Sequence, residues 1–233
     1  MSGGGTDAIT VLNGRIYVGA SNPSPDTPGG STFSRPAVFQ VTVPEDGSTA
    51  FLQPVFADNA QATQGNAGTS GTVTLNLFDP DSNAAVPSSS PRFAHDLMLD
   101  SQGDSQLVFA SHPGKRKQSL TLLNLGGPQV DDVRWATTDR GELYVVDQKA
   151  NQIWVISGTF LAGAAFASIP SGSPMEGNVG QVDLFTGAVT PFATGFTSPK
   201  GLLYVPRGGD GEQGDNEDGQ GGSRDRGGDQ GGD

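Results

Sequence analysis

The chain has 233 residues, of which 35 are glycine, 16 are proline and none is cysteine, and its formal net charge is −12. The lack of cysteine excludes a disulfide framework and thiolate chemistry. The acidic balance disfavours nucleic acid as a partner, because an acidic surface repels phosphate backbones. No apolar run approaches the roughly 18 residues of a membrane span, so none is expected, and the first residues lack the basic start and apolar core of a signal peptide.

Composition divides the chain into two parts, a β domain over residues 1–206 and a tail over residues 207–233. The tail contains eight acidic residues, three arginines and no apolar side chain. Such a segment has nothing to bury and cannot offset the entropy lost on ordering. We therefore expect an acidic, glycine-rich, disordered tail. Abundant glycine and proline in the rest of the chain favour many short strands joined by turns.

The β domain contains a repeated unit that begins at Asp7, at Asp96 and at Asp132. In each unit an aspartate leads into an apolar strand, a glycine-containing turn and a second apolar strand. Residues 199–206 repeat the first strand alone, with Lys200 at its start. Further strands are expected at 37–43, 51–57 and 152–157, a hairpin at 180–193 with its turn at Thr186-Gly187, and a loop followed by a strand at 159–169.

Several predicted strands are apolar at consecutive positions, as in IYVGA, LVFA, LYVV, IWVI and LLYV. Consecutive apolar residues over a strand-length run indicate burial on both faces. A parallel sheet would need crossover helices, and a two-layer sandwich would give strict alternation. A four-stranded antiparallel sheet between two similar sheets satisfies the pattern, and that is a β-propeller blade of about 40–50 residues. We therefore predict an all-β propeller with about four to five blades.

Residues 141–157, GELYVVDQKANQIWVIS, resemble the strand–turn–strand of NHL-repeat propellers and of the SMP-30/gluconolactonase/strictosidine synthase-like group. Residues 186–205 resemble the blade junction of these groups, with Lys200 where a histidine is common. The resemblance implies a propeller that usually has six blades, so we expect a truncated product, irregular blades, or a ring completed by another subunit. It also implies a divalent metal held by Glu, Asn and Asp in the SMP-30-like enzymes. Asp132 matches the register of that aspartate, whereas the glutamate and asparagine have no counterpart.

The repeat places a set of charged residues at one mouth of the central channel. Carboxylates at this position could bind Ca²⁺ or another divalent cation. Two alternatives stay open: each aspartate accepts backbone N–H groups and shapes its turn, or the mouth binds an organic ligand. The proposed metal ligands are Asp7, Asp96 and Asp132, and the wider candidate binding set adds His95, Asp131 and Lys200.

Other motifs are interpreted as structural. Asp79, Asp81 and Asn83 have the one-three-five spacing of a calcium loop but lack its remaining features, and a hairpin turn is favoured. Trp135 and Trp154 are expected in the core.

The functional hypothesis is a non-catalytic binding or scaffold module with an unknown ligand or protein at its face. The alternative is a divalent-metal-dependent hydrolase of the SMP-30 type. The chain has two histidines and no G-x-S-x-G, P-loop or dinucleotide motif. An incomplete ring would expose a blade face, and that exposure predicts self-association.

Overall fold

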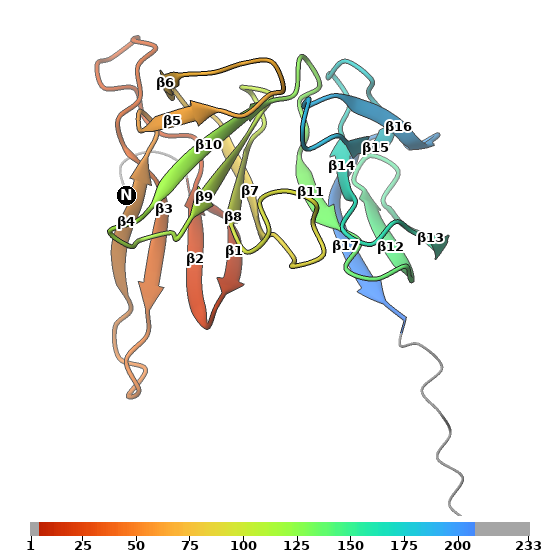
Figure 1. Cartoon of the computed structure of the whole chain (residues 1–233), viewed down its shortest axis with the longest axis horizontal. Coiled ribbons are helices and arrows are strands. Elements are labelled where there is room, and N and C mark those ends of the chain that lie inside the picture. Colours follow the sequence, from red (N-terminus) through yellow and green to blue (C-terminus); the bar gives the residue numbers. More distant parts are fainter. Residues whose placement is uncertain (1–4, 208–233) are drawn as a thin grey trace, which may run out of the picture.

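The computed structural model describes residues 5–207, which form seventeen strands in four sheets (Figure 1). Residues 5–207 contain no helix, and thus no helix that could span a membrane. The predicted tail lies outside the described residues, apart from Arg207.

Each sheet forms one blade; in Figure 1 the first two blades occupy the left and centre and the last two the right. Blade 1 contains, from its inner strand outward, β1 (Thr6–Leu12), β2 (Arg15–Ala20), β3 (Pro36–Thr42) and β4 (Phe51–Ala57). Blade 2 contains β7 (Pro80–Ala85), β8 (Leu97–Ser101), β9 (Gln106–Ser111) and β10 (Ser119–Asn124), and the hairpin of β5 (Gln61–Gln64) and β6 (Thr72–Thr74) extends its outer edge through a parallel β10–β5 pair.

The chain passes between the last two blades more than once. Blade 3 contains β11 (Asp132–Trp135), β14 (Ala165–Ile169), β15 (Asn178–Val182) and β16 (Val189–Thr194). Blade 4 has three strands, which are β17 (Pro199–Pro206), β12 (Arg140–Asp147) and β13 (Gln152–Thr159). The all-β, four-bladed propeller arrangement confirms the predicted fold class.

Two details of the predicted repeat are wrong. Asp96 precedes β8, the second strand of blade 2, because the polar segment β7 takes the inner position. The interpretation of residues 77–83 as a hairpin turn fails for the same reason. The expected hairpin over 132–147 is also divided, since β11 pairs with β14 whereas β12 pairs with β13 and β17. The predicted β15–β16 hairpin and the loop-plus-strand at 159–169 are confirmed.

Consecutive apolar residues in blade 2 face opposite neighbours. Met98 belongs to the apolar core shared with blade 3, whereas Leu97 and Leu99 belong to the core shared with blade 1. Phe109 and Val108 on β9 divide in the same way. Because successive strand side chains point to opposite faces, an uninterrupted apolar run buries both faces of a central blade.

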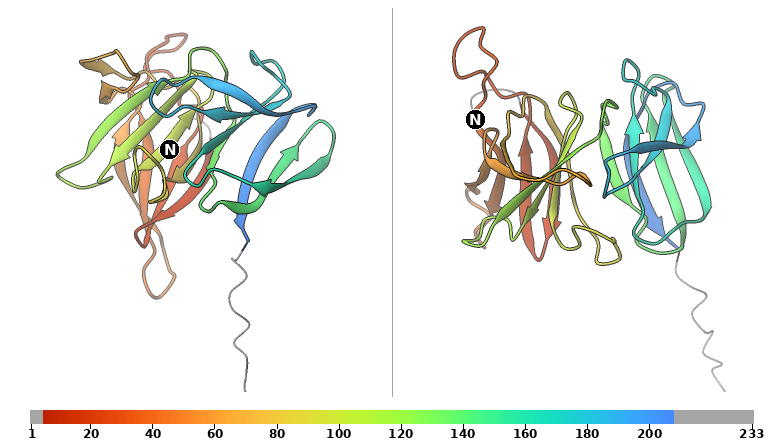
Figure 2. Two further views of the ribbon diagram at one scale, coloured as in Figure 1. Left: turned by 45° about the vertical axis from the view of Figure 1, so that its right-hand side comes forward. Right: turned by 45° about the horizontal axis from the view of Figure 1, so that its top comes forward.

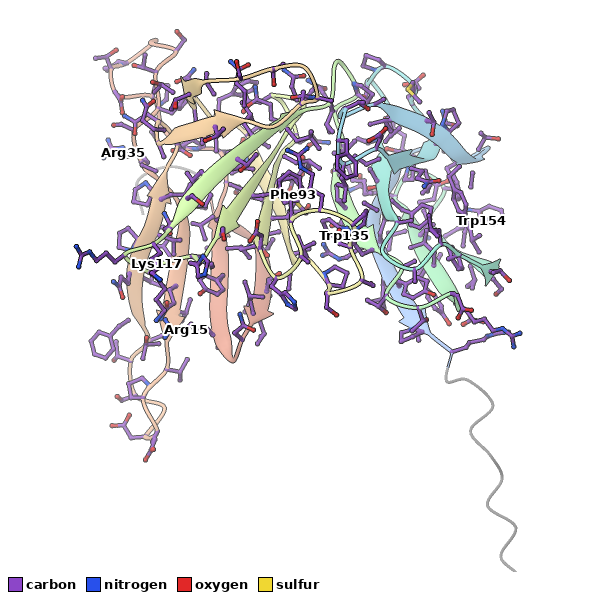
Figure 3. All side chains as sticks on the ribbon, in the orientation of Figure 1. Arg15, Arg35, Phe93, Lys117, Trp135 and Trp154 are labelled. Atoms are coloured by element: carbon purple, nitrogen blue, oxygen red, sulfur yellow. The ribbon has the colours of Figure 1, made fainter. Side chains whose placement is uncertain are left out.

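Four blades are joined by three apolar cores in the described part of the chain, one between each consecutive pair. A closed ring of four blades would need a fourth core between blades 4 and 1. Blades 1 and 4 instead lie at opposite ends of the molecule (Figure 2), and each keeps one uncovered face. Trp135 is buried near the middle, as expected, whereas Trp154 is 46% exposed at the outer edge of blade 4, so its predicted core position is wrong (Figure 3).

The turn between β15 and β16 fastens blade 3 to blade 2. Asn66 Nδ2 donates hydrogen bonds to Asn124 O at 2.7 Å and to Thr186 O at 2.6 Å. Gly187 adopts a φ of 78°, and a Cβ added there would lie 2.0 Å from Asn124 O. Glycine is therefore required both by the backbone conformation and by the close approach of blade 2.

Gly187→Ala should lower the free energy of unfolding by clearly more than Gly14→Ala. Both residues have similar positive φ values, 78° and 72°, and an alanine in this region costs about 1–2 kcal/mol. Only Gly187 also meets a backbone oxygen, since the space around Gly14 is open. Urea denaturation of both variants measures the difference, and equal losses would show that the turn does not pack against blade 2.

Candidate functional site

A pocket of about 340 Å³ lies at the centre of the propeller and is lined by the inner strands of all four blades or the residues beside them. Hydrogen bonds fix three of these strands around one carbonyl oxygen. Thr10 Oγ1 of β1 donates to Asn83 O of β7 at 3.0 Å, and Arg134 Nη1 of β11 donates to the same oxygen at 3.2 Å. The lining residues are Asp7, Ala8, Ile9, Asp81, Ser82, Asp131, Asp132, Arg134 and Gly201.

Asp132 has a structural role at this pocket. Its Oδ2 accepts a hydrogen bond from the backbone N–H of Leu202 at 2.8 Å, and its Oδ1 lies 2.7 Å from Arg134 Nη1. The first contact joins the inner strand of blade 3 to that of blade 4. Burial raises the pKa of Asp132, although Arg134 and the Leu202 N–H act against the shift. The Asp132 carboxylate therefore accepts a backbone N–H from another blade rather than from its own turn, and its side chain borders the pocket.

Lys200 and Asp131 form an ion pair beside the pocket, and Gln102 Nε2 donates to the same carboxylate oxygen at 3.3 Å. Lys200 also borders a second cavity of about 420 Å³, with a polar lining that includes Asp79, Gln102 and Lys149. The ion pair therefore lies between two openings. Asp7, Asp131, Asp132 and Lys200, all predicted at the channel mouth, are brought together here.

His95 and Asp96, the other two predicted residues, lie away from this pocket. Both are in the connection between β7 and β8, where His95 has a φ of 69°. Burial raises the pKa of Asp96, and Ser111, His112 and His95 act against the shift. Ser111 Oγ lies 3.0 Å from His112 Nδ1, so the aspartate is next to the serine rather than behind the imidazole, as a nucleophile–histidine–acid site would need.

Sequence reasoning missed the carboxylates contributed by blade 2. Asp81 is on β7 and lines the pocket, and Asp79 immediately precedes that strand. The signal was the one-three-five spacing of Asp79, Asp81 and Asn83, since a strand places alternate residues on one face. A turn at residues 79–83 would not place these side chains on one face, so the turn interpretation does not predict a site here. The same spacing on an inner strand faces the channel.

Asp100 on β8 is the least expected acidic group, because its side chain is fully buried and neither carboxyl oxygen has a hydrogen-bond partner among the described residues. Burial, together with the nearby charges of Asp81, Asp132, Asp131 and Asp79, raises its pKa well above the ordinary value. Burial likewise raises the pKa of Asp81 to about 7, and Asp131, Asp7 and Asp79 add to the shift. The pocket is thus a concentration of carboxyl groups with too few cationic partners.

The described side chains do not form a ready-made metal centre. Within residues 5–207, no three Asp, Glu or His side chains are grouped so that they could hold one. Arg134 and Lys200 already pair with Asp132 and Asp131. Metal binding by Asp7, Asp96 and Asp132 stays a prediction that the geometry does not test.

The raised pKa values predict that the protein loses stability as pH rises from about 5 to 8. Asp81 and Asp100 hold protons in the folded state over a range in which unfolded aspartates, with pKa near 4, have released them. The folded state thus binds more protons, and the free energy of unfolding falls with rising pH. Asp100→Asn should raise the free energy of unfolding at pH 8 and flatten this dependence.

Asp183→Asn provides a control of opposite sign. Asp183 Oδ1 accepts the backbone N–H groups of Phe185 and Thr186, and these bonds lower its pKa. Its contribution is present above the unfolded pKa near 4 and is lost as pH falls, so the asparagine variant should be less stable at pH 8. Urea denaturation across pH decides, and an Asp100→Asn variant less stable than wild type at pH 8 would contradict the assignment.

The chain matches no protein-family model, no curated protein and no solved structure.

Proposed function

We propose that the protein is a non-catalytic binding module that holds a positively charged ligand in the central pocket. The observation that carries the proposal is the surplus of carboxyl groups there. Asp7 and Asp81 line the pocket and have no hydrogen-bond or ion-pair partner among residues 5–207, and buried Asp100 lies close to Asp81. The approach of a cation to Asp7 and Asp81 would favour the ionised form of Asp81, and the ligand would gain from the negative potential that results.

Two kinds of ligand share this chemistry, a divalent cation such as Ca²⁺ and a small organic amine. Ca²⁺ prefers six to eight oxygen ligands, and reaching that number would require the carboxylates to move closer together. An ammonium group needs only hydrogen-bond acceptors within reach, which Asp7 and Asp81 supply as they stand. The arrangement therefore favours the amine over the metal ion.

A metal-dependent hydrolase of the SMP-30 type remains a weaker proposal. It would need a glutamate at the pocket, and the three glutamates within residues 5–207 are elsewhere. Glu142 accepts hydrogen bonds from Tyr144 and Ser157 on blade 4, and Glu176 accepts one from Gly172 N. The likeness to NHL-repeat and SMP-30-like propellers is likewise a proposal, and it rests on the strand–turn–strand pattern of residues 141–157.

Thermal melts with CaCl₂ and, separately, with 1,4-diaminobutane at matched ionic strength test the binding proposal. A ligand that binds only the folded state stabilises it by about 2.7 kcal/mol at a hundredfold excess over its dissociation constant. We expect the diamine to raise the melting temperature, and Asp81→Asn to remove the rise. Asp139→Asn, which changes an exposed carboxylate outside the pocket, should leave the rise unchanged.

A rise with CaCl₂ alone would assign the site to metal ions instead of amines. If neither cation changes the melting temperature, or if Asp139→Asn removes the rise as fully as Asp81→Asn, the pocket does not bind cations and the proposed function is wrong.

A further inference from the structure

The outward face of blade 1 is apolar across all four strands. Residues that pair across neighbouring strands share a face, and two such rows run across this blade. Ile9 and Val11 on β1 are 69% and 62% exposed, and Leu52 on β4 is 45% exposed. The rows are Ile9–Val18–Phe39–Pro54 and Val11–Ile16–Val41–Leu52, and we call these eight residues the blade 1 end face.

Blade 4 has an equivalent surface at the other end of the molecule. The cross-strand register places Leu203, Tyr144 and Val155 in one row and Val146 beside Ile153 in another. Leu203 is 57% exposed and Ile153 is 68% exposed. These five residues, together with Val205, form the blade 4 end face. The opposite side of the same strands is buried, since Leu143, Val145 and Leu202 belong to the core shared with blade 3.

The two end faces are the two halves of one missing blade-to-blade interface. Blade 1 packs against blade 2 on its other side. Its end face is therefore equivalent to the side on which blades 2, 3 and 4 each contact the blade before them. The blade 4 end face is correspondingly the side that blades 1, 2 and 3 turn toward the following blade. A blade 4 end face is therefore the natural partner of a blade 1 end face.

The residues on either side of the described range 5–207 contain little apolar surface. Residues 1–4 contain one apolar side chain, Met1, and residues 208–233 contain none. Exposed apolar patches beyond a few hundred Å² usually mark interaction sites. We propose that a second copy of the chain covers both faces, with blade 1 of each copy packed against blade 4 of the other.

The dimensions fit a stable dimer. Strands about 4.8 Å apart that rise about 3.3 Å per residue make the blade 1 end face about 19 Å by 23 Å, and the blade 4 end face about 14 Å by 26 Å. Together they give each copy roughly 800 Å², which is about what one partner contributes to a standard protein–protein interface. Two four-bladed arcs joined at both ends make an eight-bladed ring, within the range of four to eight blades that propellers use.

The two blade 1–blade 4 contacts are equivalent, and a two-fold axis between the copies relates them and closes the ring. The charge of −12 on each copy opposes the association. Salt screens charges separated by more than about 8 Å at 0.15 M ionic strength, and less far apart at higher concentration. The dimer should therefore strengthen as salt is added.

Sedimentation equilibrium of the full 233-residue chain at 0.05 M and 0.5 M NaCl tests the proposal. We expect about twice the monomer mass of 23.9 kDa, with tighter association at the higher salt. Ile9→Lys and Leu203→Glu, which place a charge in one end face each, should both sediment as monomers. Leu161→Glu changes a residue that is 72% exposed outside the end faces, and it should sediment like the wild type.

Mixing the two monomeric variants tests the head-to-tail arrangement. The Leu203→Glu copy keeps a normal blade 1 and the Ile9→Lys copy keeps a normal blade 4, so one intact interface forms between them and association should return. A mixture that fails to associate, as expected for dimers in which blade 1 meets blade 1, would overturn the head-to-tail arrangement. A wild-type chain that stays monomeric at both salt concentrations, or that forms assemblies larger than two copies, would overturn the two-copy ring.

Discussion

The structure depends on the burial of a β-sheet between two others. A four-stranded sheet with apolar residues on both faces cannot be stable in water alone, and each face needs a neighbour of the same kind. This requirement explains why Leu97, Met98 and Leu99 are consecutive and all buried, with side chains in two different cores. It also explains why the chain repeats one type of sheet, because a surface that satisfies one blade satisfies the next.

The same requirement decides what could be predicted from the sequence. Consecutive apolar runs such as those on β9 and β12 correctly predict sheets stacked face to face. The pattern does not reveal which strand is innermost, because some inner strands, such as β17, keep an apolar run while others beside the polar channel lose it. β7 is such a strand, and its sequence PDSNAA was therefore assigned to a turn. Strand partners separated by a long insertion are equally hidden, as for β11 and β14, since local pattern favours pairing with the next strand in the chain.

The same two limits, on inner strands and on distant strand partners, decide how much of the candidate site the sequence predicts. Four of the six predicted residues gather at the central pocket because the starts of β1, β11 and β17 were assigned correctly. His95 and Asp96 do not, because they precede a second strand. The carboxylates of β7 and β8 were missed, and they give the pocket its unusual electrostatics. Asp100 illustrates the reason: an aspartate inside an apolar strand reads as an exposed position, and only the three-dimensional packing reveals that it is buried beside Asp81.

The path of the chain through blades 3 and 4 has a consequence for folding. After β11 the chain leaves blade 3, builds β12 and β13 in blade 4, returns to complete blade 3 with β14 to β16, and ends in β17, which pairs with β12 as the inner strand of blade 4. Neither blade can form from a continuous segment, so residues 132–206 must come together as one cooperative unit. Pairing strands that are far apart in the sequence costs loop-closure entropy before the stabilising contacts form, and this slows folding. During synthesis, blades 1 and 2 can pack against each other while the ribosome is still at work, whereas blade 4 must wait for β17.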